Sequence, residues 1–543
     1  MTIKTKQGLS LTIIQLNFAI SLLFLGLYNF KFWREVNAVI KPEGFIDYVF
    51  FGSIVILLLS LINLILNLLC SKYTYKIVYA VLFFVAASSV YFISQYGIFI
   101  DRDMVQNIVE TRPAEAKDLM NLGMLMYLLV LGVLPIVVVS KISVQFGSFR
   151  QELFSKIKLF VISIVLIVGL LFLNYASFAS FARNNRQISH LIVPTNSLFA
   201  TISYIKQKFK SSNMPLKIIT KDAKLNPVWN KINNKTVLIL VVGETARADH
   251  FTIDGYKKQT TPNLSKRELI NFTQTYSCGT STAISLPCIF SHLGREDCSH
   301  KIAKNTENIL DFFIKTNFFV QWRDNNTGCK GICDRANQLD LTDIPDDALC
   351  ETGECFDEIL LKGLEQQIIE NPNNQIIVLH QKGSHGPSYY LRYPKSFEQF
   401  TPVCRNNQLQ KCSQSELYNT YDNTILYTDY FLNKSIELLE KLPADYNSSL
   451  IYVSDHGESL GENNLYLHGT PYFLAPDAQT HIPFFTWMSD SFIKEFSINV
   501  SCLKSKGNSS LSHDNIFHSL LGLMHIETSI YDEKLDIFDS CQL

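Results

Sequence analysis

The sequence predicts an α-helical membrane domain with five transmembrane helices, followed by an α/β domain with a mainly parallel central sheet. Two observations support this division. Only 18% of the 543 residues are charged and 47% are hydrophobic, whereas a typical soluble domain has about 25% charged residues. The apolar excess is concentrated in the first third, and short β-rich runs alternate with helical patterns after about residue 231. The formal net charge of −1 gives no basic excess, so we expect no nucleic acid partner.

Five apolar stretches in the first third are each about long enough to cross a bilayer core, which takes roughly 20 helical residues. They are Leu11–Phe30, Tyr48–Leu69, Ile77–Gln95, Leu122–Val139 and Leu159–Leu173. No small-residue cleavage site follows the first stretch before Lys31. We therefore interpret this stretch as a retained anchor rather than a cleaved signal peptide.

The placement of Lys and Arg predicts the orientation of these helices. If the N-terminus is inside, the cytoplasmic segments carry eight basic residues and one acid, Glu152. The opposite loops carry six basic and eight acidic residues. An excess of positive charge is typical of cytoplasmic loops. Five crossings then place the chain after about residue 175 outside the cytoplasm.

The cysteines favour the same placement. Eleven of the 12 follow residue 277, and they include four closely spaced pairs: Cys278 with Cys288, Cys329 with Cys333, Cys350 with Cys355, and Cys404 with Cys412. Such pairs favour disulfide-closed loops in an oxidising compartment. A zinc site built on cysteine pairs is the alternative. Cys298, Cys502 and Cys541 cannot be paired from the sequence, and at least one thiol is free or pairs elsewhere because eleven is odd.

These patterns divide the chain into a transmembrane domain at residues 1–175, a connector at residues 176–230 and a globular domain at residues 231–543. In the connector, Ile188–Lys210 combines apolar residues with three lysines near its end. We expect it to form either an interfacial amphipathic helix on the bilayer surface or an ordinary linker helix.

Five runs in the globular domain are predicted strands, because apolar and β-branched residues fill both faces, as buried parallel strands require. They are Thr236–Val242, Phe318–Trp322, Gln375–Leu379, Leu450–Val453 and Pro483–Trp487. Ligands of open α/β sheets bind beyond the carboxyl ends of the strands. Acidic, imidazole and amide side chains follow three or four of these strands, so we expect them at one edge of the sheet.

A metal site is predicted at this edge. Glu244 follows the first strand, and Asp455 with His456 follows the fourth. Carboxylates and imidazole suit Zn²⁺ or Mn²⁺, although each group alone would be typical of a helix cap or a surface pair. His385 and His468 are further candidate ligands or proton donors.

A hydroxyl-rich segment from Ser277 to Ser285 leads into an apolar, helical stretch. A Thr or Ser at a helix N-terminus lies in a positive dipole field beside free backbone N–H groups. This environment suits an oxygen nucleophile that attacks a phosphoryl centre. Helix capping is the alternative interpretation.

Six segments together resemble the phosphoethanolamine transferases that modify lipid A, a family within the alkaline phosphatase/sulfatase superfamily that includes polymyxin-resistance enzymes. They are Val242–Arg247, Cys278–Thr282, Lys330–Gly331, His385–Pro387, Ser454–Asn463 and Tyr466–Gly469. The resemblance covers the whole chain, with membrane helices, connector and periplasmic catalytic domain in that order. It implies an alkaline phosphatase/sulfatase-like fold in a multi-pass protein of the bacterial inner membrane.

The resemblance also implies the reaction. The enzyme would transfer phosphoethanolamine from phosphatidylethanolamine to a phosphate of lipid A through a covalent phosphothreonine. The added ammonium group would lower the negative surface charge and give resistance to polymyxins and cationic peptides. The implied partners are the donor lipid, the lipid A acceptor and the bilayer, and we expect a monomer.

Roles for individual residues follow from the resemblance. Thr282 would be the nucleophile and the fourth ligand of a Zn²⁺ cofactor, beside the three ligands named above, Glu244, Asp455 and His456. Lys330, His385 and His468 would hold the phosphoryl group and the acceptor, or a second zinc.

Three positions in the loop after the third membrane helix match the donor-lipid-binding positions of the family: Asn107, Thr111 and Glu115. Their i, i+4, i+8 spacing would align them on one helical face, although Pro113 interrupts that face. A solvated loop helix is the alternative.

Two other classes of function remain open. One is a related transferase that adds phosphoethanolamine to a lipopolysaccharide core sugar or transfers a glycerophosphate. The other is a membrane-tethered phosphatase or sulfatase. A sulfatase nucleophile would be a modified Cys or Ser in a Cys/Ser-x-Pro-x-Arg context, which the region around Thr282 lacks.

Overall fold

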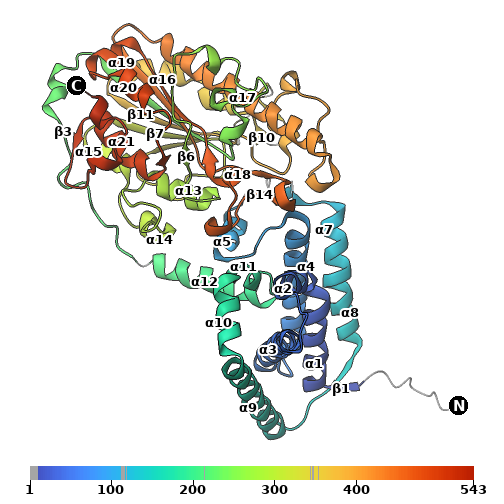
Figure 1. The fold of residues 1–543 in the computed structure, drawn as a ribbon. Helices are drawn as coiled ribbons and strands as arrows, with labels where there is room; N and C mark the ends of the chain where they lie inside the picture. Colours follow the sequence, from blue (N-terminus) through green and yellow to red (C-terminus); the bar gives the residue numbers. More distant parts are fainter. Residues whose placement is uncertain are drawn as a thin grey trace. The chain divides into compact units, whose positions relative to one another are not determined.

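The computed structural model describes residues 10–542 except 112–115, 118, 213, 343, 345, 347, 352 and 353. The chain forms two compact units (Figure 1). The membrane unit comprises residues 1–105 and 120–204, and the catalytic unit comprises residues 106–119 and 205–543.

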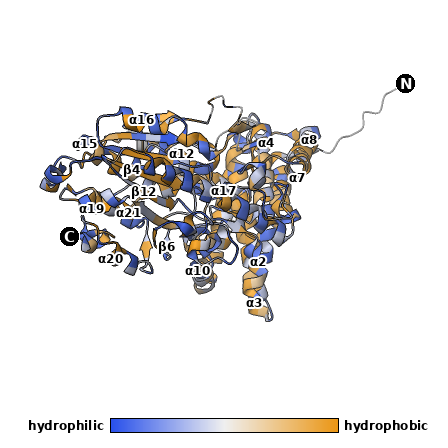
Figure 2. Cartoon of the chain, turned by 90° about the horizontal axis from the view of Figure 1, so that it is seen from above, coloured by the Kyte–Doolittle hydropathy of each residue, from blue (hydrophilic) through white to orange (hydrophobic). Residues whose placement is uncertain are grey.

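The membrane unit is built from apolar helices, which Figure 2 shows largely in the hydrophobic colour at α3. Four helices are long and apolar enough to cross a membrane: α3 (Phe45–Leu69), α4 (Tyr75–Tyr96), the continuous α7–η2–α8 segment (Leu122–Lys141) and α9 (Phe149–Leu173). A fifth candidate is a pair bent by 66°, Ile13–Tyr28 with α2 (Phe30–Ile40). By length and composition, the described residues therefore contain four candidate spans, or five if the bent pair is one span. Four of the predicted apolar runs lie in these helices, and the fifth, Leu11–Phe30, lies in the bent pair except for Leu11 and Thr12, which belong to β1 (Ser10–Thr12), and Asn29 at the bend.

Polar side chains join helices inside the membrane unit. Asn17 of α1 (Ile13–Leu23) donates a hydrogen bond to Asn67 Oδ1 of α3 at 2.8 Å. Tyr79 of α4 donates to Asn17 Oδ1 at 2.5 Å. All three side chains are buried. Such interhelical hydrogen bonds stabilise helix association where water cannot compete for the donors.

The connector forms α10 (Tyr175–Asn184), α11 (Arg186–Ser189) and α12 (Thr195–Ser212). Phe199, Ile202, Ile205 and Phe209 of α12 are all exposed. Their spacing places them along one stripe of the helix, a pattern expected of an interfacial helix.

A seven-stranded sheet forms the centre of the catalytic unit, in the order β5-β16-β12-β4-β11-β7-β8. The strands are β5 (Ile270–Asn271), β16 (Phe484–Met488), β12 (Tyr446–Ser454), β4 (Lys235–Gly243), β11 (Gln375–His380), β7 (Phe319–Asp324) and β8 (Asn337–Asp340). The five strands from β12 to β8 are parallel, whereas β16 is antiparallel to both neighbours. The sheet is therefore mixed.

The predicted run Pro483–Trp487 is a strand, but its expected parallel direction is wrong. A parallel neighbour needs a crossover connection, usually a helix. The described segment between β12 and β16 contains short strands, turns and α18 (Asp477–Thr480), a helix of only four residues. The chain therefore returns along β12 in the opposite direction.

Helices surround this sheet, and the central strand β4 is buried along its length from Thr236. The helices are α13 (Thr282–Ile289), α14 (His300–Lys304), α15 (Ile309–Lys315), α16 (Leu364–Glu370), α17 (Gln414–Glu440), α19 (Asp490–Glu495), α20 (Val500–Ser505) and α21 (Asp514–Leu523). A second, three-stranded sheet, β15-β6-β17, comprises His481–Ile482, Thr275–Tyr276 and Leu511–Ser512.

Five disulfides close loops of the catalytic unit. The four predicted pairs, 278–288, 329–333, 350–355 and 404–412, are confirmed. The fifth joins Cys502 to Cys541. Among the described residues, Cys70 and Cys298 keep free thiols, and Cys298 is the unpaired one of the eleven cysteines after residue 277.

Candidate metal centre and active site

The site begins where two neighbouring parallel strands end. Gly243 of β4 pairs with Ser454 of β12, so Glu244 and Asp455 leave the sheet side by side. Glycine is required at 243 because a Cβ atom there would overlap the Tyr452 ring. The register of one strand pair therefore brings together two carboxylates that lie far apart in the sequence.

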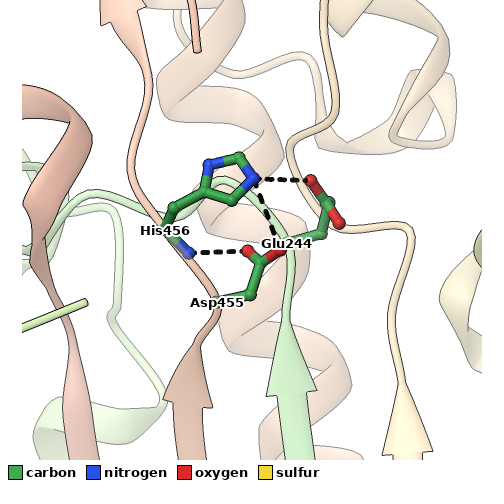
Figure 3. Close-up of side chains that lie close together, drawn as sticks. All are labelled: Glu244, Asp455 and His456. Carbon is green, nitrogen blue, oxygen red and sulfur yellow. Dashed lines mark hydrogen bonds and ion pairs between the residues drawn. The ribbon is translucent and has the colours of Figure 1, made fainter. Parts of the chain in front are cut away.

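Glu244, Asp455 and His456 form a buried cluster (Figure 3). The Nε2 atom of His456 lies 3.5 Å from Glu244 Oε1 and 3.3 Å from Asp455 Oδ2. One ligand atom from each residue lies within 4.8 Å of the other two. All three side chains are at most 1% exposed. These distances place three potential ligand atoms around one point.

Hydrogen bonds hold the cluster in this orientation. Asp455 Oδ1 accepts the backbone N–H groups of Thr245 and His456 at 3.1 and 2.7 Å. The Nδ1 atom of His456 contacts its neighbour's carbonyl, Gly457 O, at 2.8 Å. Because a carbonyl only accepts, Nδ1 carries the proton and Nε2 presents its lone pair to the carboxylates. Such outer contacts are typical of metal ligands.

The cluster fits a divalent cation. Within the described structure, Glu244 Oε1 and Asp455 Oδ2 are buried without a hydrogen-bond partner, which is costly for an ionised carboxylate unless a cation compensates it. Burial, and then the charge of Glu244, raises the pKa of Asp455 well above its ordinary value. Burial lowers the pKa of His456 to about 3. The imidazole is therefore neutral, which is the form that binds a metal.

Thr282 lies against this cluster as the first residue of α13. Its hydroxyl donates to Glu244 Oε2 at 2.9 Å and lies 3.5 Å from His456 Nε2. The neighbouring Thr280 hydroxyl instead donates to the Thr470 carbonyl at 2.7 Å. Among the described hydroxyl residues of this segment, Thr282 therefore hydrogen-bonds to the cluster.

His468 and His385 adjoin the cluster. The His468 ring centroid is 4.5 Å from that of His456 and 5.6 Å from that of His385. The Nδ1 atom of His468 contacts Glu458 Oε2 at 2.9 Å, and Glu458 also accepts from Tyr389 at 2.8 Å. Glu458 lies in the Ser454–Asn463 motif, but no role was predicted for it from the sequence.

Asn326 was also missed as an individual residue, although it follows β7 at the expected sheet edge. Its Nδ2 atom donates to Glu244 Oε2 at 2.7 Å and to Gln381 O at 2.9 Å. A polar residue two positions beyond a strand end was the available signal. The contact orients the carboxylate that also accepts from Thr282.

Lys330 lies in the loop closed by the disulfide from Cys329 to Cys333. Its side chain is only 6% exposed, and Nζ lies 3.1 Å from Thr327 O and 3.9 Å from Glu110 Oε2. Glu110 belongs to residues 106–119, which are part of the catalytic unit. The lysine charge is therefore held between a carbonyl and a carboxylate.

Of the three donor-loop candidates, Asn107 lies in α5 (Arg102–Glu110). Thr111 follows the end of that helix and donates to the Asn107 carbonyl at 2.7 Å. Glu115 lies outside the described residues. Asn107 and Thr111 are therefore joined by a hydrogen bond, and the common helical face of all three residues stays a prediction.

Two family models match the chain. The sulfatase model matches residues 236–526, and the model described as phosphoethanolamine transferase EptA/EptB matches residues 58–209. The two matches cover the catalytic sheet and much of the apolar helical region.

Full-length relatives extend these matches. Phosphoethanolamine transferase EptA of Escherichia coli (strain K12) is 39% identical over 521 residues, which cover 95% of this chain and 94% of the relative. Phosphatidylethanolamine transferase Mcr-1 of Escherichia coli is 35% identical over 509 residues, 92% of each chain. The integral membrane protein lipooligosaccharide phosphoethanolamine transferase A of Neisseria meningitidis has a TM-score of 0.93 at 36% identity, covering 98% and 99% of the two chains. The chain therefore belongs to the EptA-type phosphoethanolamine transferases, which carry a sulfatase-family domain.

Proposed function

We propose that this inner-membrane enzyme transfers phosphoethanolamine from phosphatidylethanolamine to a phosphate of lipid A, through a covalent intermediate on Thr282. The relatives' names specify phosphatidylethanolamine for Mcr-1 and lipooligosaccharide for the Neisseria enzyme. The observation that carries the proposal is the Thr282 hydroxyl, 2.9 Å from Glu244 Oε2 within a buried cluster of ligand atoms. A hydroxyl in this position suits two-step nucleophilic catalysis.

The first step forms the covalent intermediate. After its proton is released to water, the Thr282 oxygen attacks the phosphorus of phosphatidylethanolamine. The bond from phosphorus to the diacylglycerol oxygen breaks, and that oxygen takes a proton from His385 or His468. These two rings adjoin each other and one adjoins His456, so either imidazole is a candidate general acid.

The second step regenerates the enzyme. A phosphate oxygen of lipid A attacks the same phosphorus, and the bond from phosphorus to Thr282 Oγ1 breaks. The threonine oxygen takes a proton from water, and the proton lost by the lipid A phosphate returns through water to the histidine that acted in the first step. The product carries phosphoethanolamine joined to the lipid A phosphate. We assign Lys330 to holding the phosphoryl group, because its buried ammonium can offset the negative charge of a phosphodiester.

Glu244, Asp455, His456 and Thr282 would hold a Zn²⁺ ion. Bound there, the ion would withdraw charge from the anionic phosphodiester and lower the pKa of the threonine hydroxyl. Two carboxylates and a neutral imidazole are a ligand set that zinc accepts.

The membrane region would serve the reaction by confining the enzyme to the bilayer that contains both substrates. We propose five crossings within residues 1–175, a connector at 176–230 whose α12 lies on the bilayer surface, and a periplasmic catalytic domain at 231–543. Asn107, Thr111 and Glu115 would contact the donor lipid. The ammonium group added to lipid A would weaken the binding of polymyxins and cationic peptides.

Mass spectrometry tests the proposal. Lipid A from cells with the protein should gain the mass of one phosphoethanolamine, and Thr282→Ala should abolish the gain. Thr280→Ala and Ser281→Ala are the matched hydroxyl controls and should retain part of the activity. A gain on a core sugar instead of lipid A would reassign the acceptor.

Trapping the intermediate tests the mechanism. Native enzyme incubated with phosphatidylethanolamine alone should carry phosphoethanolamine on the peptide that contains Thr282. Lipid A should then discharge the adduct much faster than water does. Equal discharge by water would indicate a hydrolase, and an adduct on another residue would overturn the assignment.

A further inference from the structure

A histidine outside the candidate metal site bridges the segment before Thr282 and the end of β12, which Asp455 and His456 directly follow. His513 lies between β17 and α21, and its side chain is fully buried. Its Nδ1 atom lies 3.1 Å from the backbone nitrogen of Cys278, and its Nε2 atom lies 2.9 Å from the carbonyl oxygen of Ser454. One imidazole ring therefore contacts two segments that are distant in the sequence.

The partners determine the state of the ring. The Cys278 N–H can only donate, so Nδ1 accepts from it, and the Ser454 carbonyl can only accept, so Nε2 carries the proton. A protonated ring would direct a second N–H at the Cys278 N–H. Burial lowers the pKa of His513 to about 4, so the ring remains neutral near pH 7. Both hydrogen bonds are therefore present under ordinary conditions.

The two segments are the ones whose separation matters for the reaction. Cys278 is four residues before Thr282, and Ser454 immediately precedes Asp455. The Ser454 hydroxyl also accepts the Ala246 N–H at 2.9 Å, which links the end of β12 to the segment after Glu244. The ring thus connects the proposed nucleophile to the ends of both ligand-bearing strands.

The backbone around His513 strengthens this connection. Its own N–H donates to the Tyr276 carbonyl at 3.1 Å, and β17 pairs in parallel with β6 at Thr275–Tyr276. The main chain of residue 513 therefore contacts Tyr276 and its side chain contacts Cys278, both in the segment that leads to Thr282. The backbone contacts attach His513 to the segment before Thr282, and its ring bonds to Ser454 at the end of β12. Together these contacts set the distance between that segment and the end of β12.

We propose that His513 is a positioning residue for phosphoethanolamine transfer, which holds the Thr282 segment at a fixed distance from Asp455 and His456. It touches none of the proposed reacting atoms, so its effect is exerted through the backbone of Cys278 and Ser454. The inference rests on the proposed nucleophilic role of Thr282. A displacement of about 1 Å at a nucleophile can cost on the order of 100-fold in rate, so the expected loss is mainly in kcat.

The test compares three substitutions in the full-length enzyme with a matched control. His513→Ala removes both hydrogen bonds. His513→Asn keeps an acceptor near the Nδ1 position, and His513→Gln keeps a donor near the Nε2 position. His518→Ala is the control, because His518 is a buried histidine of α21, the helix that follows His513, and its Nδ1 accepts from the Asp532 N–H at 3.1 Å.

We expect His513→Ala to lower kcat about 100-fold while the KM for phosphatidylethanolamine and the zinc content change less than about threefold. The Asn and Gln variants should each recover part of the loss, and the rate of adduct formation on Thr282 should fall in parallel with kcat. His518→Ala, assayed at a temperature where it remains folded, should keep a kcat near that of the native enzyme.

Three results would overturn the positioning role: a native kcat in His513→Ala, a loss confined to KM, or an equal loss of kcat in His518→Ala. If the alanine variant does not fold, the Asn and Gln variants decide by the same separation of kcat from KM. Failure of the proposed function is distinguishable, because the native enzyme would then form no adduct on Thr282.

Discussion

Replacing Glu244 with Gln should separate the two effects of the buried carboxylates, their mutual repulsion and their affinity for a cation. Ligand atoms of Glu244 and Asp455 lie within 4.8 Å of each other. At an effective dielectric constant of about 20, two full charges at that separation repel by about 3.5 kcal/mol. The metal-free protein relieves part of this repulsion by holding a proton, as the raised pKa of Asp455 indicates.

Metal-free Glu244→Gln should therefore be at least as stable as the metal-free native protein, by up to about 3 kcal/mol at a pH where both carboxylates would ionise. Added zinc should reverse this order of stability. At a free concentration of 1,000 times its Kd, zinc stabilises the native state by about 4 kcal/mol. The variant lacks one anionic ligand and should gain far less.

Thermal unfolding of the full-length protein in detergent, after chelation and again with added zinc, measures both effects. Glu440→Gln is the control, because this carboxylate of α17 is 42% exposed and pairs with Arg267. Its zinc response should match that of the native protein. The reasoning is wrong if zinc raises the midpoint of Glu244→Gln as much as that of the native protein, or if the chelated variant is clearly less stable than the chelated native protein.

Three further predictions concern stability, thiols and the donor. Burial raises the pKa of Asp254 to about 7, above the roughly 3.9 of an unfolded chain. Folding therefore binds a proton, and the free energy of unfolding should fall by up to about 4 kcal/mol as the pH rises from about 4 to 7. Urea unfolding at several pH values should show this fall in the native protein and a much smaller fall in Asp254→Asn. Alkylation without reduction should label at most Cys298 and Cys70, and labelling of the disulfide cysteines in the folded protein would contradict the five bridges. Asn107→Ala should raise the KM for phosphatidylethanolamine about tenfold, roughly the value of one hydrogen bond, with less effect on a soluble head-group analogue; equal loss on both would indicate a folding defect.

Much of this architecture was predictable because the relevant signals are local. Apolar runs mark β4, β7, β11 and β12, and the rule that ligands lie beyond strand ends predicted Glu244, Asp455 and His456 at one edge. The direction of β16 was not predictable in the same way, because an apolar strand has the same composition in either direction. Its direction depends on how the chain returns after β12.

Long-range partners account for the remaining gaps. Cys502 and Cys541 are 39 residues apart, and only the fold brings their Cα atoms to a distance that a disulfide can span. His513 shows the same limit. Its partners lie 235 and 59 positions away, so a lone histidine before a helix carries no local sign of its contacts.

The strand order also determines when the metal centre can form during biosynthesis. β4 lies between β12 and β11, and both of these strands follow it by more than 100 residues in the sequence. Glu244 therefore reaches the periplasmic side more than 200 residues before Asp455. At about 5–20 residues per second, its partner strand emerges roughly 10–40 s later. If the proposed residues hold a cation, the complete ligand set is available only when export is nearly finished, so loading of the enzyme would be a late event in its maturation.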